Sequence, residues 1–94
     1  MEILYKPRAA NAILKVAAFV ESKNTTGSGL RWFEKLDEKI FSVAQSKTGL
    51  LKCKHHSLAK FGYRCYEYKG WIIAFRISGD VFEVCRFIWA ARLS

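Results

Sequence analysis

Hydrophobic residues recur every three or four positions through the first half of the chain, the spacing that places them on one face of an α-helix. The first such stripe lies in residues 7–22 and consists of Ile13, Val16, Ala17 and Val20. The second lies in residues 29–45 and consists of Leu30, Phe33, Leu36, Ile40 and Val43. A turn-like stretch separates the two, and Ser28 stands where its hydroxyl can cap the second helix. The pattern therefore predicts a helical hairpin, preceded by a short strand at Glu2–Tyr5.

The second half of the chain changes to short runs rich in β-branched and aromatic residues, which predict strands. After a basic connection at residues 46–62, the runs cover residues 63–68, 71–77 and 81–89, separated by Lys-Gly and Gly-Asp turns. The expected fold is α+β: a short N-terminal strand, a helical hairpin, then a three-stranded antiparallel β-meander packed on the two helices. A chain of 94 residues is long enough for a single domain, residues 1–94, with one core.

Counting outward from two-residue turns assigns the strand residues to two faces of the sheet. The bulkier face carries Arg64, Tyr66, Tyr68, Trp71, Ile73, Phe75, Ile77, Phe82, Val84, Arg86 and Ile88. The other face carries Cys65, Glu67, Ile72, Ala74, Arg76, Glu83, Cys85, Phe87 and Trp89. We expect the helices to cover the first face and leave the second open. The register also predicts a cross-strand ion pair between Arg76 and Glu83.

The charge balance favours an anionic partner, because the chain carries 16 Lys and Arg against 8 Asp and Glu, a net charge of +8. Nucleic acid, an acidic protein segment and a membrane surface all fit this charge. The apolar run at residues 13–20 is interrupted by Lys15 and too short to span a bilayer, and no signal-peptide pattern is seen, so we expect a cytoplasmic protein that does not act at a membrane.

The three cysteines, Cys53, Cys65 and Cys85, are an odd number without a Cys-x-x-Cys pair, which suggests neither a disulfide framework nor a zinc ribbon. We interpret them as reduced, mostly buried thiols. The counted register separates Cys65 from Cys85 by two strand spacings, about 10 Å, too far for a disulfide.

A basic cluster in the connection before the strands is the first candidate site. It comprises Lys52, Lys54, His55, His56 and Lys60, with Arg64 following. Lysines can hold phosphates and histidines can move protons near neutral pH, which are the requirements for RNA cleavage through the 2′-hydroxyl. The alternative is a solvated basic loop without a partner. A metal site is not expected, because the spacing of Cys53, His55 and His56 fits no common zinc motif, and no cofactor is predicted.

A second set of candidates lies on the strands. The counted register places Arg64 and Arg86 on the apolar face, where an arginine must reach solvent, pair with a carboxylate or bind an anion. Trp89 and Arg92 form a basic and aromatic end that can stack on a base or anchor a partner, or Trp89 can simply pack.

Taken together, these motifs resemble the RelE/ParE toxin superfamily of type II toxin–antitoxin systems over nearly the whole chain. The shared features are the opening E-I-L-Y-K strand, the helix pair, Arg64 seven residues before Trp71, the strand W-I-I-A-F-R-I, the G-D turn and the ending V-F-E-V-C-R-F-I-W-A-A-R. The resemblance implies a small antiparallel sheet packed on two helices. It also implies a cognate antitoxin, small and acidic, that forms a hetero-oligomer with the toxin and neutralises it.

The resemblance leaves two mechanisms open. RelE-like members cleave messenger RNA on the ribosome, and Lys52 and Lys54 fall where such toxins keep catalytic lysines. ParE-like members block DNA gyrase and are not nucleases. Glu67 stands roughly where RelE-like toxins have an arginine, and no Tyr or His follows the last strand. Trp89 stands where ParE-like members commonly have a histidine, but the pattern of Arg64, Arg76, Arg86 and Arg92 is closer to ParE. A non-toxic binding module of the same fold is the third alternative.

Overall fold

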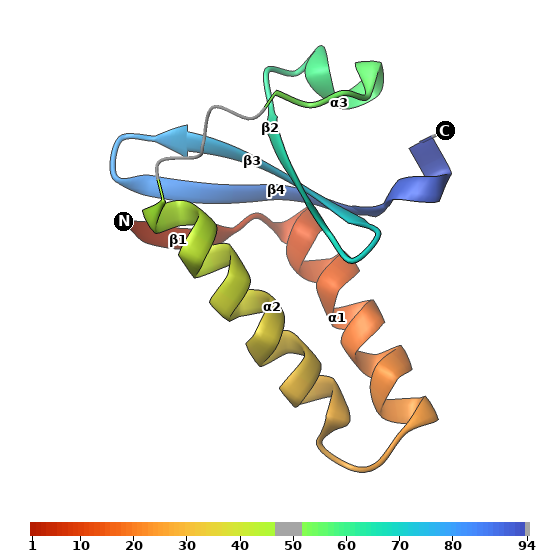
Figure 1. The fold of residues 1–94 in the computed structure, drawn as a ribbon. Coiled ribbons are helices and arrows are strands. Elements are labelled where there is room, and N and C mark those ends of the chain that lie inside the picture. Colours follow the sequence, from red (N-terminus) through yellow and green to blue (C-terminus); the bar gives the residue numbers. More distant parts are fainter. Residues whose placement is uncertain (47–51, 94) are drawn as a thin grey trace.

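The structure, a computed structural model, describes residues 1–46 and 52–93, and it confirms the α+β prediction with its order of elements. The elements are β1 (Glu2–Tyr5), α1 (Pro7–Lys23), α2 (Ser28–Gln45), α3 (His56–Ala59), β2 (Arg64–Tyr68), β3 (Trp71–Ser78), β4 (Val81–Trp89) and a 3₁₀ turn, η1 (Ala90–Leu93). The strands form one sheet in the order β1-β4-β3-β2. Helices α1 and α2 lie on one side of this sheet and α3 on the other (Figure 1). Part of the predicted basic connection, residues 47–51, lies outside the described residues.

The first strand joins the sheet at the edge of β4, and it is parallel to β4 whereas the other pairs are antiparallel. A parallel partner requires a long crossover, which the helical hairpin and the meander supply. Pairing runs only from Glu2 opposite Val81 to Tyr5 opposite Val84. The amide of Lys6 then donates to the Val84 carbonyl, and α1 begins at Pro7. The second half of β4 therefore has no strand from the described residues along its outer edge.

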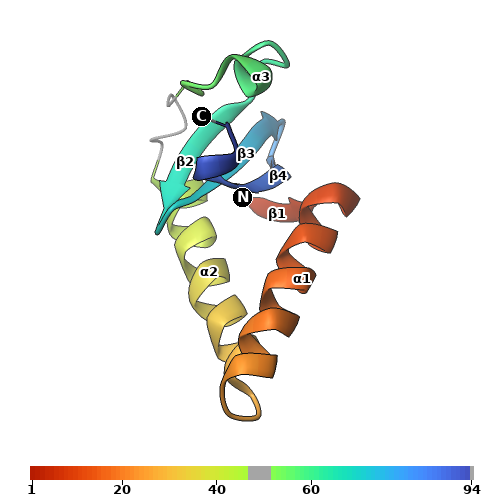
Figure 2. The ribbon, with the colours of Figure 1, turned by 90° about the vertical axis from the view of Figure 1, so that its right-hand side faces the viewer.

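The predicted apolar face of the sheet does face the helices. Four members of the predicted helix stripes, Ile13, Leu36, Ile40 and Val43, are buried in the same cluster as Phe75 and Phe82. The rings of Phe75 and Phe82 stack with centroids 4.4 Å apart. The two helices diverge from their connecting turn toward the sheet (Figure 2), so the core lies in the part of the hairpin next to the strands.

The counted register is wrong beyond the middle of β4, because a β-bulge interrupts it. Val84 pairs with Phe75 and Arg86 pairs with Ala74, which leaves Cys85 as an extra residue without a partner in β3. One extra residue reverses the faces of everything that follows. Phe87 consequently joins the helix-facing core, and Arg86 lies on the opposite face, not on the apolar face as predicted. Burial of Phe87 and exclusion of an arginine from the core both favour the bulge.

The tip of the helical hairpin is held by Glu21, not by the predicted Ser28 cap. The Glu21 carboxylate accepts hydrogen bonds from the amides of Gly27 and Gly29, each at 2.8 Å. These two bonds lower the pKa of Glu21. Ser28 is the first helical residue, and its hydroxyl donates to the Val20 carbonyl at 3.3 Å. A side chain six to eight residues away therefore satisfies amides that a local cap was expected to satisfy.

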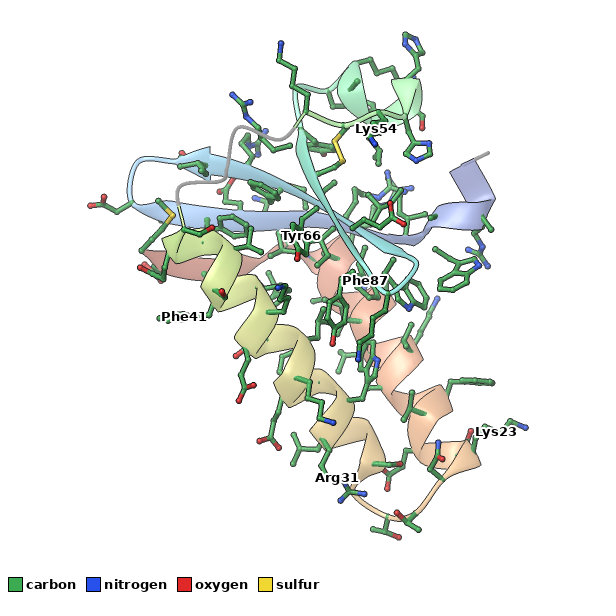
Figure 3. The ribbon with its side chains drawn as sticks, viewed as in Figure 1. Lys23, Arg31, Phe41, Lys54, Tyr66 and Phe87 are labelled. Carbon is green, nitrogen blue, oxygen red and sulfur yellow. A yellow bond between two sulfur atoms is a disulfide. The ribbon has the colours of Figure 1, made fainter. Side chains whose placement is uncertain are left out.

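The second face of the sheet is not fully open. Residues 52–60, which include α3 and are called the α3 segment, cover part of it. Leu58 and Cys53 are 1% and 7% exposed and pack against Ile72 and Ala74. A disulfide joins Cys53 to Cys65 of β2, with the two Cα atoms 4.7 Å apart (Figure 3). The prediction of three reduced thiols is therefore wrong for this pair and holds for Cys85, which is free and buried. The counted register tested only Cys65 against Cys85, which is not the pair that forms the bond.

Candidate functional site

A groove of about 740 Å³ lies between α1 and the C-terminal end of the chain. From α1 it is lined by Arg8, Asn11, Ala12, Lys15 and Val16. From the sheet and η1 it is lined by Trp71, Arg86, Phe87, Ile88, Trp89 and Arg92. Residues at the two ends of the sequence thus form one surface.

The α1 wall is a single helical stripe. Its residues are spaced three and four apart, which places them one above another on the same face of the helix. Arg8 and Lys15 are exposed, whereas Ala12 and Val16 are half-buried and pack against the core cluster. The wall therefore presents Ala12 and Val16 with Arg8 at the start of the stripe and Lys15 beside Val16.

The opposite wall follows the outer edge of β4. Successive residues of a strand point to opposite faces, yet Arg86, Phe87, Ile88 and Trp89 all line the groove. A groove lined by four consecutive strand residues must run along the edge of the strand. This is the half of β4 that β1 leaves unpaired.

Three aromatic side chains form part of the lining of the groove. Phe87 stacks on Trp71 with centroids 4.5 Å apart, and Trp89 meets Trp71 edge-on at 5.1 Å. Phe87 is only 4% exposed, whereas Trp89 is 43% exposed. The Trp89 ring lies directly over Gly70 of the preceding turn, where an added Cβ would be 2.7 Å from ring atoms. The absence of a side chain at Gly70 therefore lets this ring approach the turn closely.

The groove is strongly cationic. Arg8, Lys15, Arg86 and Arg92 line it, and no carboxylate does so among the residues that the structure describes. None of these four cations forms an ion pair with a carboxylate in residues 1–46 or 52–93. Burial and the neighbouring Arg8 guanidinium lower the pKa of Arg86, while Tyr63 opposes the change. Unpaired like charges held close together favour an anionic ligand.

Three of the predicted residues come together here. Arg86, Trp89 and Arg92 all line the groove, although Arg86 reaches it from the face opposite to the predicted one. Sequence analysis did not select Arg8 and Lys15. The available signal was their position on one stripe with Ala12 and Val16, but two cations on a helix usually indicate only its solvated side.

The basic cluster of the connection lies elsewhere. Lys54, His55, His56 and Lys60 belong to the α3 segment, and none of them lines the groove. Figure 3 shows Lys54 on the α3 side of the sheet and Phe87 on the side of α1 and α2. Lys52 forms an isolated bridge with Arg64 of β2, so these two predicted residues do lie together. Arg64 stands opposite Phe75, as the register predicted.

The described lining of the groove offers three arginines and one lysine that can bind an anion. It contains no histidine, carboxylate, tyrosine or cysteine, so Lys15 is the group in it that could transfer a proton or act as a nucleophile. No group of three or more potential metal ligands occurs in the described part of the chain. Arg76 forms the predicted ion pair with Glu83 at 3.1 Å, which confirms its structural role. None of the described helices is both long enough and apolar enough to cross a membrane.

No protein-family model matches this sequence, and no curated protein matches it either.

Proposed function

We propose that this protein is a growth-inhibiting toxin of the RelE/ParE kind, which acts in the cytoplasm by binding its target through the basic groove. The observation that carries the proposal is the groove itself: four cations without an ion pair among the described residues surround apolar and aromatic side chains, and its described lining contains no histidine or carboxylate. The order of elements agrees with the fold that the resemblance implies. DNA gyrase is the proposed target, and a small acidic antitoxin is the proposed neutralising partner.

A ribosome-dependent ribonuclease is the second candidate, and one contact favours it. The bridge between Lys52 and Arg64 brings two of the predicted nuclease residues together at the edge of β2. His55 follows in the same segment and is half-buried. In this alternative the site would lie on the α3 side, and the groove would only assist binding.

Two triple variants of equal charge separate the candidates in an induced-expression assay of growth arrest. The groove triple is Arg8→Ala, Lys15→Ala and Arg92→Ala, and the connection triple is Lys52→Ala, Lys54→Ala and Lys60→Ala. Each removes three positive charges from exposed positions, so a general effect of net charge would weaken both equally. The proposal expects loss of growth arrest in the groove triple alone. Loss in the connection triple alone, or in a His55→Ala and His56→Ala variant, would select the nuclease.

Assays with purified protein then identify the process that is blocked. Inhibition of gyrase supercoiling without cleavage of translated messenger RNA is the expected result. Protein that leaves supercoiling intact but stops translation would overturn the assignment to gyrase. Harmless overexpression of a folded protein would indicate instead a non-toxic binding module.

A further inference from the structure

The groove combines apolar side chains with a cationic rim. Ala12 and Val16 of α1 and Trp71 of the sheet line it and are half-buried, and half-buried Ile88 contributes from the other face of β4, where it packs on the α3 side. Arg8, Lys15 and Arg92, by contrast, are exposed. A ligand that fills this surface must therefore offer apolar groups along its centre and negative charge on both sides.

The length of the groove suits a short stretch of polypeptide. The α1 stripe from Arg8 to Val16 rises by about 12 Å, at 1.5 Å per residue. That distance corresponds to about four residues of extended chain, or to about two turns of helix. A segment of this size can place an apolar side chain against Ala12 and Val16 while its carboxylates reach the cations of the lining.

A polynucleotide would use this surface less completely. Phosphates would meet the cations, but bases need exposed aromatic faces on which to stack. Phe87 is buried and covered by Trp71, so Trp89 is the exposed ring available among the described lining residues. The apolar stripe formed by Ala12 and Val16 would have no apolar partner in a phosphate backbone.

We infer that the groove between α1 and the outer edge of β4 binds an acidic peptide segment with apolar anchors. Carboxylates of the peptide pair with Arg8, Lys15, Arg86 and Arg92, and its apolar side chains pack on Ala12, Val16 and Trp71. Assigning this segment to the neutralising antitoxin rests on the proposed function, and it places antitoxin and target in competition for one groove. The binding itself does not depend on toxicity.

Fluorescence anisotropy tests the inference with a labelled synthetic peptide in which glutamates flank one Trp and two Leu residues. A second peptide has Gln for every Glu, and an oligouridine of equal charge represents nucleic acid. Lys15→Glu and Arg92→Glu should each weaken binding of the acidic peptide by about tenfold or more, because charge reversal replaces an attraction with a repulsion between like charges. Lys35→Glu makes the same charge change on the exposed side of α2, outside the groove, and should leave binding nearly unchanged.

Three outcomes would overturn the inference. The first is equal binding of the glutamate and glutamine peptides, and the second is equal weakening by Lys35→Glu and Lys15→Glu. The third is tighter binding of the oligouridine with sensitivity to the same two groove variants, which would assign the groove to nucleic acid. A protein that binds the peptide in the groove without arresting growth would contradict the proposed function and leave this inference standing.

Discussion

At the scale of single residues, Cys85 determines from which face of the sheet the following residues of β4 reach the groove. As the extra residue of the bulge, it moves Arg86 away from the helix-facing core and brings Phe87 and Trp89 onto the side of Trp71. The alternation of residue types in β4 allows its register to be counted, but a bulge needs no special residue at its extra position and so leaves no signal in the sequence. The side on which Arg86 lies was therefore beyond sequence reasoning, whereas the ion pair of Arg76 and Glu83, before the bulge, was predicted correctly.

Gly70 offers a direct test of how Trp89 is held. Gly70 and Gly62 both have a left-handed backbone, with φ of 86° and 75°, but only Gly70 has a ring against it. Gly62→Ala should cost about 1–2 kcal/mol of unfolding free energy, from backbone strain alone. Gly70→Ala should cost about 1–3 kcal/mol more if the ring stays in place, or displace the ring if it yields. Urea unfolding and the chemical shift of the Trp89 indole measure the two effects.

Equal stability of the two variants, with an unmoved Trp89 resonance in Gly70→Ala, would contradict the close packing of Trp89 on the turn. Displacement of the ring should also weaken binding of the acidic peptide, because Trp89 lines the groove. The Gly62→Ala variant serves as the control for that loss as well.

Tyr5 gives the molecule a predictable response to alkali. Its hydroxyl donates to Asp37 of α2, and burial, followed by this hydrogen bond and the Asp37 charge, raises the pKa of Tyr5 above 10.0. At high pH the unfolded chain loses this proton more readily than the folded one, so the Tyr5 contribution should be lost as pH rises above about 10. Urea unfolding between about pH 8 and 11 measures it. The Tyr5→Phe variant should have an unfolding free energy about 1 kcal/mol lower at neutral pH, and this free energy should fall less steeply as the pH rises. A decline identical to that of the unchanged protein would contradict the assignment.

At the scale of elements, the long periodic segments were predictable and the short one was not. The apolar stripes of α1 and α2 are long enough to define helices, and the two turns define the meander. The four-residue α3 has no period to detect, and it is held by tertiary contacts of Leu58 and by the disulfide. A pairing between Cys53 and Cys65 depends on where the connection crosses the sheet, which the sequence does not encode locally. The same reason explains why Glu21, and not Ser28, satisfies the amides at the start of α2.

Reduction of the disulfide should loosen the α3 segment selectively. The bond closes a loop with a sequence separation of 12, and loops of this length contribute about 3 kcal/mol in chain-entropy estimates. In a Cys85→Ala background, where no other thiol remains, dithiothreitol should lower the unfolding free energy by about 2–3 kcal/mol. It should also accelerate proteolysis within residues 52–63.

The control is the same background carrying Cys53→Ser and Cys65→Ser, which dithiothreitol should not affect. Unchanged proteolysis of the connection after reduction would mean that burial of Leu58 alone holds the segment on the sheet. Because cytosolic thiols are normally reduced, the comparison also shows how the α3 segment behaves in the proposed compartment.

At the scale of the whole molecule, the groove is a property of tertiary structure. Residues 8–16 and 86–92 meet because β1 pairs in parallel with β4 and starts α1 beside the outer edge of that strand. Sequence reasoning found the basic and aromatic end of the chain but not its partner helix, since neither segment points to the other. Lysines and histidines are more concentrated in the basic connection, yet the described residues of that connection lie outside the groove.

The distribution of the core also predicts how stability varies along the helical hairpin. The buried residues Ala9 and Ile13 of α1 lie near the sheet, whereas Phe19 and Leu30, near the tip, are 62% and 64% exposed. Local opening free energies follow buried apolar contact. Amides in residues 18–23 should therefore exchange with deuterium faster than those in residues 11–16 of the same helix. Glu21→Gln removes the charge that binds two amides of the tip, so it should accelerate amide exchange at the tip only. Uniform exchange rates along α1 would show instead that the hairpin opens as one unit.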